Sequence, residues 1–122
     1  MSKDNISFGK ISEEQASSFL ESQGYRILFR NYKAQGAEID IIAREKDTIC
    51  FVEVKARCSD RFGSPQEAVT PAKQQKIARA ALMFLQENKL QDKSCRFDVV
   101  AIIRQAGREK FSLFRDAFVL ND

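Results

Sequence analysis

Residues 38–57 read EIDIIAREKDTICFVEVKAR. Apolar residues dominate on both sides of a short polar turn at residues 45–47. Two such runs joined by a tight polar turn predict a β-hairpin. We therefore expect one strand over residues 38–43 and a second strand over residues 48–56.

Charged side chains interrupt both strands of this hairpin. Because successive side chains of a strand point to opposite faces, Glu38 and Asp40 are expected on one face of the first strand, together with Ile42. The apolar residues expected on its other face are Ile39, Ile41 and Ala43. The same alternation places Glu53 and Lys55 on one face of the second strand.

Pairing around the turn makes Asp40 and Glu53 cross-strand neighbours on one face of the sheet. Two carboxylates this close repel each other, and the repulsion is stronger in a partly buried site. A positive charge must therefore compensate. The sequence offers two alternatives for it, Lys55 and a bound divalent cation.

A helix is expected before the hairpin. Residues 12–15 read SEEQ, with Ser12 at the N-cap, acids in the first turn and Gln at the capping-box position, so we expect the helix to begin there. Its apolar stripe consists of Ala16, Phe19 and Leu20, and Gly24 ends it. Glu13 lies beside this stripe and can face the sheet, whereas Glu14 points to solvent.

A second helix is expected after the hairpin. Pro71 suits a first helical position, and the helix runs to about Asn88. Its apolar stripe consists of Ile77, Ala80, Ala81, Phe84 and Leu85. Lys73 lies within this stripe, so its aliphatic stem can cover apolar surface while its ammonium group reaches the edge of the sheet.

The remaining segments complete an α/β pattern. Strands are expected over residues 25–32, 97–103 and 110–114, a loop over residues 58–65, and a packed tail at residues 117–120. The nearly continuous apolar run of residues 97–103 predicts a central strand covered on both faces. The order of helix, three strands, helix and two strands predicts a mixed five-stranded sheet with helices on its faces.

Composition excludes several classes of protein. The 122 residues fit one domain over residues 1–122. The absence of histidine excludes Ser-His-Asp and Cys-His catalysis and His-ligated zinc. Three cysteines without a C-x-x-C pair argue against a disulfide framework, and no signal peptide or membrane-spanning run is found, so we expect a soluble cytoplasmic protein without membrane contact. The net charge of +3 permits a polyanionic partner without requiring one.

Each charged residue also has an ordinary structural explanation. Asp40, Glu53 and Lys55 could form a salt-bridge network without chemistry. Glu13 is an acid of the kind that the helix dipole favours in a first turn, and Lys73 could be a solvated helix lysine. The combination is more specific than its members: a Glu on the first helix, an Asp on one strand and Glu-x-Lys on the next.

This combination resembles the PD-(D/E)XK nuclease superfamily, whose members have the restriction endonuclease-like fold. More closely, the chain resembles the bacterial YraN family of uncharacterised proteins, which is similar in outline to archaeal Holliday-junction resolvases. The segments that carry the resemblance span nearly the whole chain: Gly9 with Glu13 and Ala16, Gly24-Tyr25, Asn31-Tyr32, residues 38–43, residues 51–57, Phe62-Gly63, Glu67-Ala68-Val69 with Lys73, and residues 96–100. Ser12 and Ala37 depart from the family pattern, which usually has Gly at both positions.

The resemblance implies a role for each residue of the combination. Asp40 and Glu53, with the Val54 carbonyl, would hold Mg²⁺ or Mn²⁺ through hard oxygen ligands. Lys55 would position or activate the attacking water and stabilise charge on the phosphorane. Glu13 would join through a water or a second metal ion.

The resemblance also implies how nucleic acid is held. Lys73 would neutralise a phosphate oxygen. Arg57, Arg61 and Lys76 flank the same face and would contact backbone phosphates without sequence preference. Glu38 shares the face of Asp40, and the sequence leaves its role open between a supporting acid and a salt-bridge partner.

Three functions follow as hypotheses. The first is a metal-dependent endonuclease acting on structured or branched DNA. The second is a non-catalytic nucleic-acid-binding or interaction protein that keeps the nuclease fold, and the third is a structural salt-bridge cluster in an assembly protein. The intact Asp40, Glu53 and Lys55 favour the enzyme, because a binding module has no need of clustered carboxylates near phosphate. RNA as the substrate and a homodimer as the assembly remain open alternatives.

Overall fold

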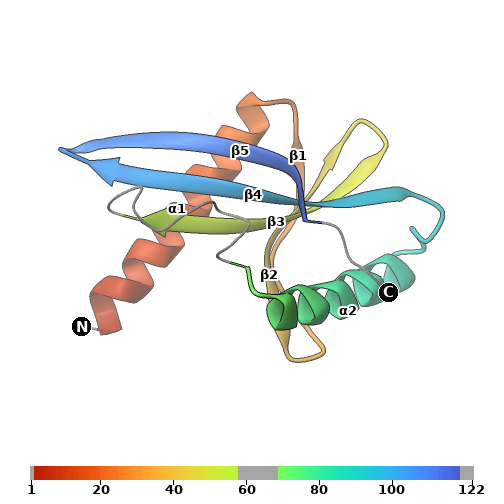
Figure 1. The fold of residues 1–122 in the computed structure, drawn as a ribbon. Helices are drawn as coiled ribbons and strands as arrows, with labels where there is room; N and C mark the ends of the chain where they lie inside the picture. The colour runs from red at the N-terminus through yellow and green to blue at the C-terminus, as the bar shows by residue number, and fades with distance from the viewer. Residues whose placement is uncertain (1, 58–68, 119–122) are drawn as a thin grey trace.

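A computed structural model describes residues 2–57 and 69–118, with side chains from residue 12 onward. The elements follow the expected order of helix, three strands, helix and two strands (Figure 1). Their bounds are α1 Ser2–Ser22, β1 Arg26–Ala34, β2 Ala37–Glu45, β3 Thr48–Arg57, α2 Pro71–Glu87, β4 Ser94–Gln105 and β5 Arg108–Phe118. The expected loop over residues 58–65 lies outside the described residues.

The five strands form one sheet in the order β1-β2-β3-β4-β5. Three of the four pairings are antiparallel, and β3 pairs with β4 in parallel. A parallel pair needs a crossover connection, and α2 lies in the segment that joins β3 to β4. The fold is therefore an α/β fold with a mixed five-stranded sheet and two helices, consistent with the restriction endonuclease-like class.

The two helices cover opposite faces of the sheet. On one face, Ala16 and Leu20 of α1 pack in a cluster with Val52. On the other face, Ile77 and Phe84 of α2 pack in a cluster that contains Phe51 and Ile42. The expected central position of the fourth strand is confirmed, because β4 lies between β3 and β5 and its residues Val99, Val100 and Ile102 are fully buried.

The expected alternation along β2 is correct only in part. Ile41 and Ala43 pack on the α1 face, as expected, but Ile39 packs in the cluster on the α2 face together with Ile42. The paired residues of β2 and β3 extend from Glu45↔Thr48 only as far as Ile41↔Val52. Beyond that point β2 is no longer aligned by the ladder to β3, so the strict two-residue alternation ends at the position of Asp40.

The expected start of the first helix is wrong. α1 begins at Ser2, so Ser12 and Glu13 lie inside the helix and not at its N-terminus. The Ser12 side chain is buried, and its Oγ accepts a hydrogen bond from Arg104 Nη2 at 3.2 Å. A serine that looks like a cap in the sequence is thus a contact between the helix and β4. The expected end is correct, because Gly24 follows the helix with a φ of 95°.

The second helix begins as expected. Pro71 is its first residue, and Thr70 caps it by accepting a hydrogen bond from the Lys73 backbone N–H at 3.2 Å. Strands β1, β4 and β5 are longer than expected, and residues 117–118 belong to β5 instead of forming a separate tail. Neither helix, within residues 2–57 and 69–118, is long and apolar enough to cross a membrane.

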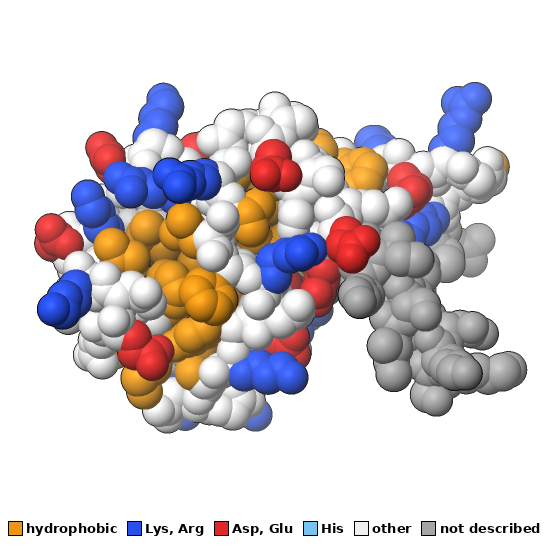
Figure 2. All heavy atoms as spheres, turned by 180° about the vertical axis from the view of Figure 1, so that it is seen from behind, with side chains coloured by type: hydrophobic (Ala, Val, Ile, Leu, Met, Phe, Trp, Pro, Cys, Tyr) orange, Lys and Arg blue, Asp and Glu red, His pale blue; other side chains and the backbone are white. Residues whose placement is uncertain are grey.

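The surface carries one conspicuous apolar area. Figure 2 shows hydrophobic side chains gathered in a patch with Lys and Arg side chains around it. The large hydrophobic residues that are most exposed are Leu28, Phe29 and Leu82. Single exposed apolar side chains are common on folded proteins, so these three residues do not by themselves locate a functional site.

Candidate functional site

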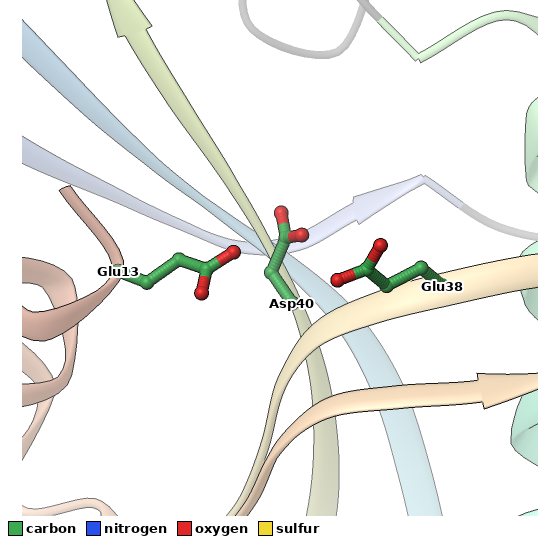
Figure 3. A group of neighbouring side chains, drawn as sticks. All are labelled: Glu13, Glu38 and Asp40. Atoms are coloured by element: carbon green, nitrogen blue, oxygen red, sulfur yellow. The ribbon is translucent and has the colours of Figure 1, made fainter. Parts of the chain in front are cut away.

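Three carboxylates from two elements converge at one place. Glu13 extends from α1, and Asp40 and Glu38 extend from β2, so that Asp40 lies between the two glutamates (Figure 3). One carboxylate oxygen of each lies within 4.8 Å of the others. The sequence left the role of Glu38 open, and the structure places it in this group of acids.

Helix α1 presents Glu13 to the sheet because its neighbours anchor the helix. Arg104 of β4 donates hydrogen bonds to Ser12 and, at 2.7 Å, to Gln15 Oε1. Glu13 is half-buried and Glu14 is exposed, as expected from the helical periodicity. Burial and the nearby Asp40 carboxylate raise the pKa of Glu13, and the polar side chain of Asn31 opposes that shift.

Asp40 connects the two strands where their ladder ends. The Val54 backbone N–H donates a hydrogen bond to Asp40 Oδ2 at 2.8 Å. This bond replaces a backbone partner for Val54 and holds the Asp40 carboxylate beside β3. Ala37, which departs from the family pattern, does not have a positive φ; its neighbour Gly36 supplies that conformation, with φ 75°.

Glu53 is the most unusual acid of the site. Its residue is only 2% exposed, and its Oε1 has no hydrogen-bond partner among the described residues. Its other oxygen, Oε2, lies 3.8 Å from Lys73 Nζ. Burial and the Asp40 carboxylate raise the pKa of Glu53 to about 8, although the Lys73 ammonium group opposes the shift.

Two lysines approach these acids from different elements. Lys73 of α2 makes the ion pair with Glu53, as its place in the apolar stripe of the helix suggested. Lys55 of β3 is half-buried, and burial together with the neighbouring Lys73 lowers its pKa. Both Asp40 and Glu53 oppose that shift, so Lys55 lies within the electrostatic reach of both acids.

These groups surround one cleft of about 420 Å³. It is lined by Gly36, Ala37, Glu38, Asp40, Glu53, Val54, Lys55, Lys73, Lys76 and Ile77. Seven of these residues, Glu38 included, are candidate site residues in the sequence, and a carboxylate oxygen of Glu13 lies within 4.8 Å of Asp40. Arg57 ends β3, two residues beyond Lys55, and is not among the lining residues. Arg61 lies outside the described residues.

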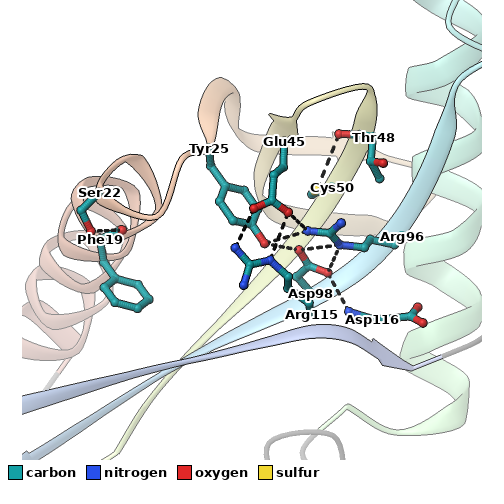
Figure 4. Close-up of polar contacts among 10 residues, drawn as sticks. All are labelled: Phe19, Ser22, Tyr25, Glu45, Thr48, Cys50, Arg96, Asp98, Arg115 and Asp116. Carbon is teal, nitrogen blue, oxygen red and sulfur yellow. Dashed lines mark hydrogen bonds and ion pairs between the residues drawn. The ribbon is translucent and has the colours of Figure 1, made fainter.

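A second buried acid lies on the opposite face of the sheet and is surrounded by donors. Asp98 is fully buried and accepts hydrogen bonds from Tyr25 Oη at 2.7 Å, from Arg96 Nε at 3.0 Å and from the Asp116 backbone N–H at 2.9 Å (Figure 4). Arg96 also pairs with Glu45, which in turn pairs with Arg115 at 2.6 Å. These contacts satisfy the hydrogen-bonding capacity of the Asp98 carboxylate, so we assign a structural role to this network.

The donor set of the cleft fits a small divalent cation. Mg²⁺ and Mn²⁺ take carboxylate and carbonyl oxygens, and the cleft offers Asp40, Glu53 and the backbone of Val54. A buried carboxylate oxygen without a donor, Glu53 Oε1, is unfavourable unless a cation or a proton completes it. The electrostatics of the site therefore favour the binding of a positive ion.

Comparisons with known proteins agree on one family. The model of the uncharacterised protein family UPF0102 matches residues 12–102. Among similar proteins, a UPF0102 protein of Syntrophus aciditrophicus is 48% identical over 116 residues, covering 95% of this chain and 91% of its own. A UPF0102 protein of Desulforapulum autotrophicum is 49% identical over 110 residues, covering 90% and 91% of the two chains. The names of these relatives state no activity.

Proposed function

Since the chain belongs to the uncharacterised family UPF0102, we propose its activity from the cleft itself: a metal-dependent endonuclease that hydrolyses phosphodiester bonds in structured or branched DNA. The proposal rests mainly on the environment of Glu53. A buried carboxylate with a donorless oxygen, beside a second carboxylate and two lysines, is a poor structural element and a suitable cation site.

The metal ligands in this proposal are Asp40, Glu53 and the Val54 carbonyl. When bound there, Mg²⁺ or Mn²⁺ would supply a water of lowered pKa and would polarise the scissile phosphate. Asp40 is already held toward β3 by the Val54 N–H, which supports a role for both strands in holding the ion. Glu13 and Glu38 complete the acidic side of the site.

In this proposal, Lys55 takes part in proton transfer and Lys73 neutralises negative charge on the phosphate. Burial and Lys73 lower the pKa of Lys55, so a larger share of its amine is neutral near pH 7 than for an exposed lysine. A neutral amine can accept a proton from the attacking water, and in its protonated form it stabilises charge on the phosphorane. Lys73 is less buried, with 43% of its side chain exposed, and is placed to neutralise a phosphate oxygen.

Substrate binding depends on the cations around the cleft. Lys76 lines it, Arg57 is the last residue of β3, and Arg61 follows four residues later in the sequence. With a net charge of only +3, we expect few phosphate contacts and weak affinity, tighter for branched substrates that present several backbones to one face.

Calorimetry tests the metal site. Wild-type protein is expected to bind Mn²⁺, and Asp40→Asn is expected to weaken binding at least about tenfold, because a charged ligand is lost. Asp92→Asn, a change at an exposed position of the turn before β4, is the matched control and should bind as wild type does. Absence of Mn²⁺ binding to wild type would contradict the proposal.

A cleavage assay tests the activity. With Mg²⁺ or Mn²⁺, we expect cleavage of flapped or four-way junction DNA in preference to linear, single-stranded or RNA substrates. Lys55→Ala should abolish cleavage while changing DNA affinity little, and Lys110→Ala, at an exposed position on β5, is its control. Intact DNA binding without Lys55-dependent cleavage of any substrate would leave the non-catalytic nucleic-acid-binding protein as the better hypothesis.

A further inference from the structure

Two strand residues other than glycine have a backbone conformation that strands normally avoid. Among the described residues, Asn31 in β1 has a φ of 57° and Asp116 in β5 a φ of 55°. The other non-glycine residues with positive φ lie in turns or directly after α2: Gln35, Lys46, Lys89 and Ala106. A positive φ in mid-strand costs about 1 kcal/mol or more, so the surrounding structure must enforce it.

Each of these two residues lies beside an acid. The backbone N–H of Asp116 donates to the buried Asp98. The Asn31 side chain is near enough to Glu13 to lower the pKa of that acid. It also lies opposite Asp40 in the pairing of β1 with β2, since its neighbours Arg30 and Tyr32 pair with Ile41 and Ile39.

From the register that sets Asn31 opposite Asp40, and from the 4.8 Å grouping of Glu13 with Asp40, we propose that Asn31 is a positioning residue whose side-chain amide donates to Glu13 and holds it beside Asp40. This inference rests on the proposed function for its consequence, because the position of Glu13 matters only if the acids hold a cation. Glu13 and Asp40 repel each other, and the Asn31 amide supplies a donor that keeps Glu13 in the group despite that repulsion.

The residue type supports this role. Asn tolerates a positive φ better than most residues, and its amide can donate to a carboxylate. Asp would tolerate the backbone conformation but would add a repelling charge. Gly would accept the conformation freely but would offer no donor. Asn therefore combines the backbone conformation and the hydrogen bond that this position requires.

The test compares Asn31→Gly with Gln35→Gly. Both residues are exposed and have nearly equal positive φ, 57° and 54°, so both changes relieve the same backbone strain, but only the first removes the donor to Glu13. We expect Asn31→Gly to weaken Mn²⁺ binding about tenfold, as loss of a group that orients a ligand does, and Gln35→Gly to leave it unchanged. Equal Mn²⁺ affinities of the two variants would overturn the inference.

A double-mutant cycle separates positioning from a merely structural role. In the Glu13→Ala background, which removes the acceptor, Asn31→Gly is expected to cause no further loss of Mn²⁺ affinity, because the two residues act through one contact. Additive losses would overturn the inference. Urea unfolding in metal-free buffer should show no loss of stability for Asn31→Gly; a fall in stability with Mn²⁺ affinity unchanged would make Asn31 a structural residue instead.

A metal-free measurement keeps this inference distinct from the proposed function. The side-chain amide signal of Asn31 in a ¹⁵N-resolved NMR spectrum should shift in Glu13→Gln and stay in place in the control Glu14→Gln, whose side chain is exposed. An unmoved signal would overturn the inference even if the protein binds Mn²⁺. A shifted signal in a protein that binds no Mn²⁺ would support the Asn31–Glu13 contact while contradicting the metal site.

Discussion

Glu53 and Asp98 are both buried acids of neighbouring strands, and their surroundings differ completely. Asp98 accepts hydrogen bonds from Tyr25, Arg96 and a backbone N–H, and lies on the α1 side of the sheet (Figure 4). Glu53 lies on the α2 side beside another carboxylate, with one oxygen that no donor reaches among the described residues.

Under the proposed function, this difference separates an acid that serves the fold from an acid that serves the cation site. A buried charge that is fully paired contributes to a unique fold, and removal of its partners is strongly unfavourable. A buried carboxyl group with an unpaired oxygen lowers stability, and a bound cation or a proton can complete it. The four predictions that follow test this comparison, beginning with the largest expected effect.

The largest effect is expected on the Asp98 side. Asp98→Ala leaves Arg96 without its buried partner and Tyr25 without its acceptor, so the free energy of unfolding should fall by about 3–5 kcal/mol. Urea unfolding measures this change, with the exposed Asp92→Ala as the control. A loss below about 1 kcal/mol would contradict the structural role of Asp98.

The second effect is stabilisation by metal. Mn²⁺ at about 100 times its dissociation constant should raise the free energy of unfolding by about 2.7 kcal/mol, since the ion binds the folded protein only. Glu53→Gln should abolish most of this gain. Arg115→Gln, which alters only the network around Asp98, should keep it, because its contacts lie on the other face. Thermal or urea unfolding with and without Mn²⁺ measures this gain in stability for wild type and for both variants.

The third effect is a dependence of stability on pH. The pKa of Glu53 is about 8 in the folded protein, against 4.5 for an ordinary glutamate. Between these values the folded protein keeps a proton that the unfolded chain has released, so rising pH favours unfolding, by at most about 1.4 kcal/mol per pH unit. In metal-free buffer, wild type should lose stability from pH 5 to 8 relative to Glu53→Gln. Parallel curves would contradict the raised pKa.

The smallest effect is expected for Asp40→Asn in metal-free buffer. The amide oxygen of Asn can still accept the Val54 N–H, and the repulsion with Glu13 and Glu53 disappears. The melting temperature should therefore stay unchanged or rise, by an equivalent of less than about 1 kcal/mol. A loss of several kcal/mol would instead indicate a structural salt-bridge cluster.

Some features of this protein follow from the sequence alone because they depend on local physical chemistry. The polar turn at residues 45–47 between apolar runs predicts the β2–β3 hairpin, and Pro71 predicts the start of α2. Period-two alternation correctly places Glu53 and Lys55 on one face of β3, opposite the apolar residues of the α1 side. These rules involve residues near one another in the chain, so no knowledge of the fold is needed to apply them.

Other features were decided only when distant segments met. Ser12 has the sequence context of an N-cap, but in the structure its hydroxyl accepts a hydrogen bond from Arg104 of β4. Ile39 packs on the α2 face instead of the expected α1 face, because the ladder to β3 ends beside Asp40. The cation that pairs with Glu53 comes from Lys73 on α2, and the polar side chain that lowers the pKa of Glu13 comes from Asn31, which has a positive φ in β1. Local periodicity states which way a side chain points, whereas its partner and its degree of burial depend on the packing of elements that are far apart in the chain.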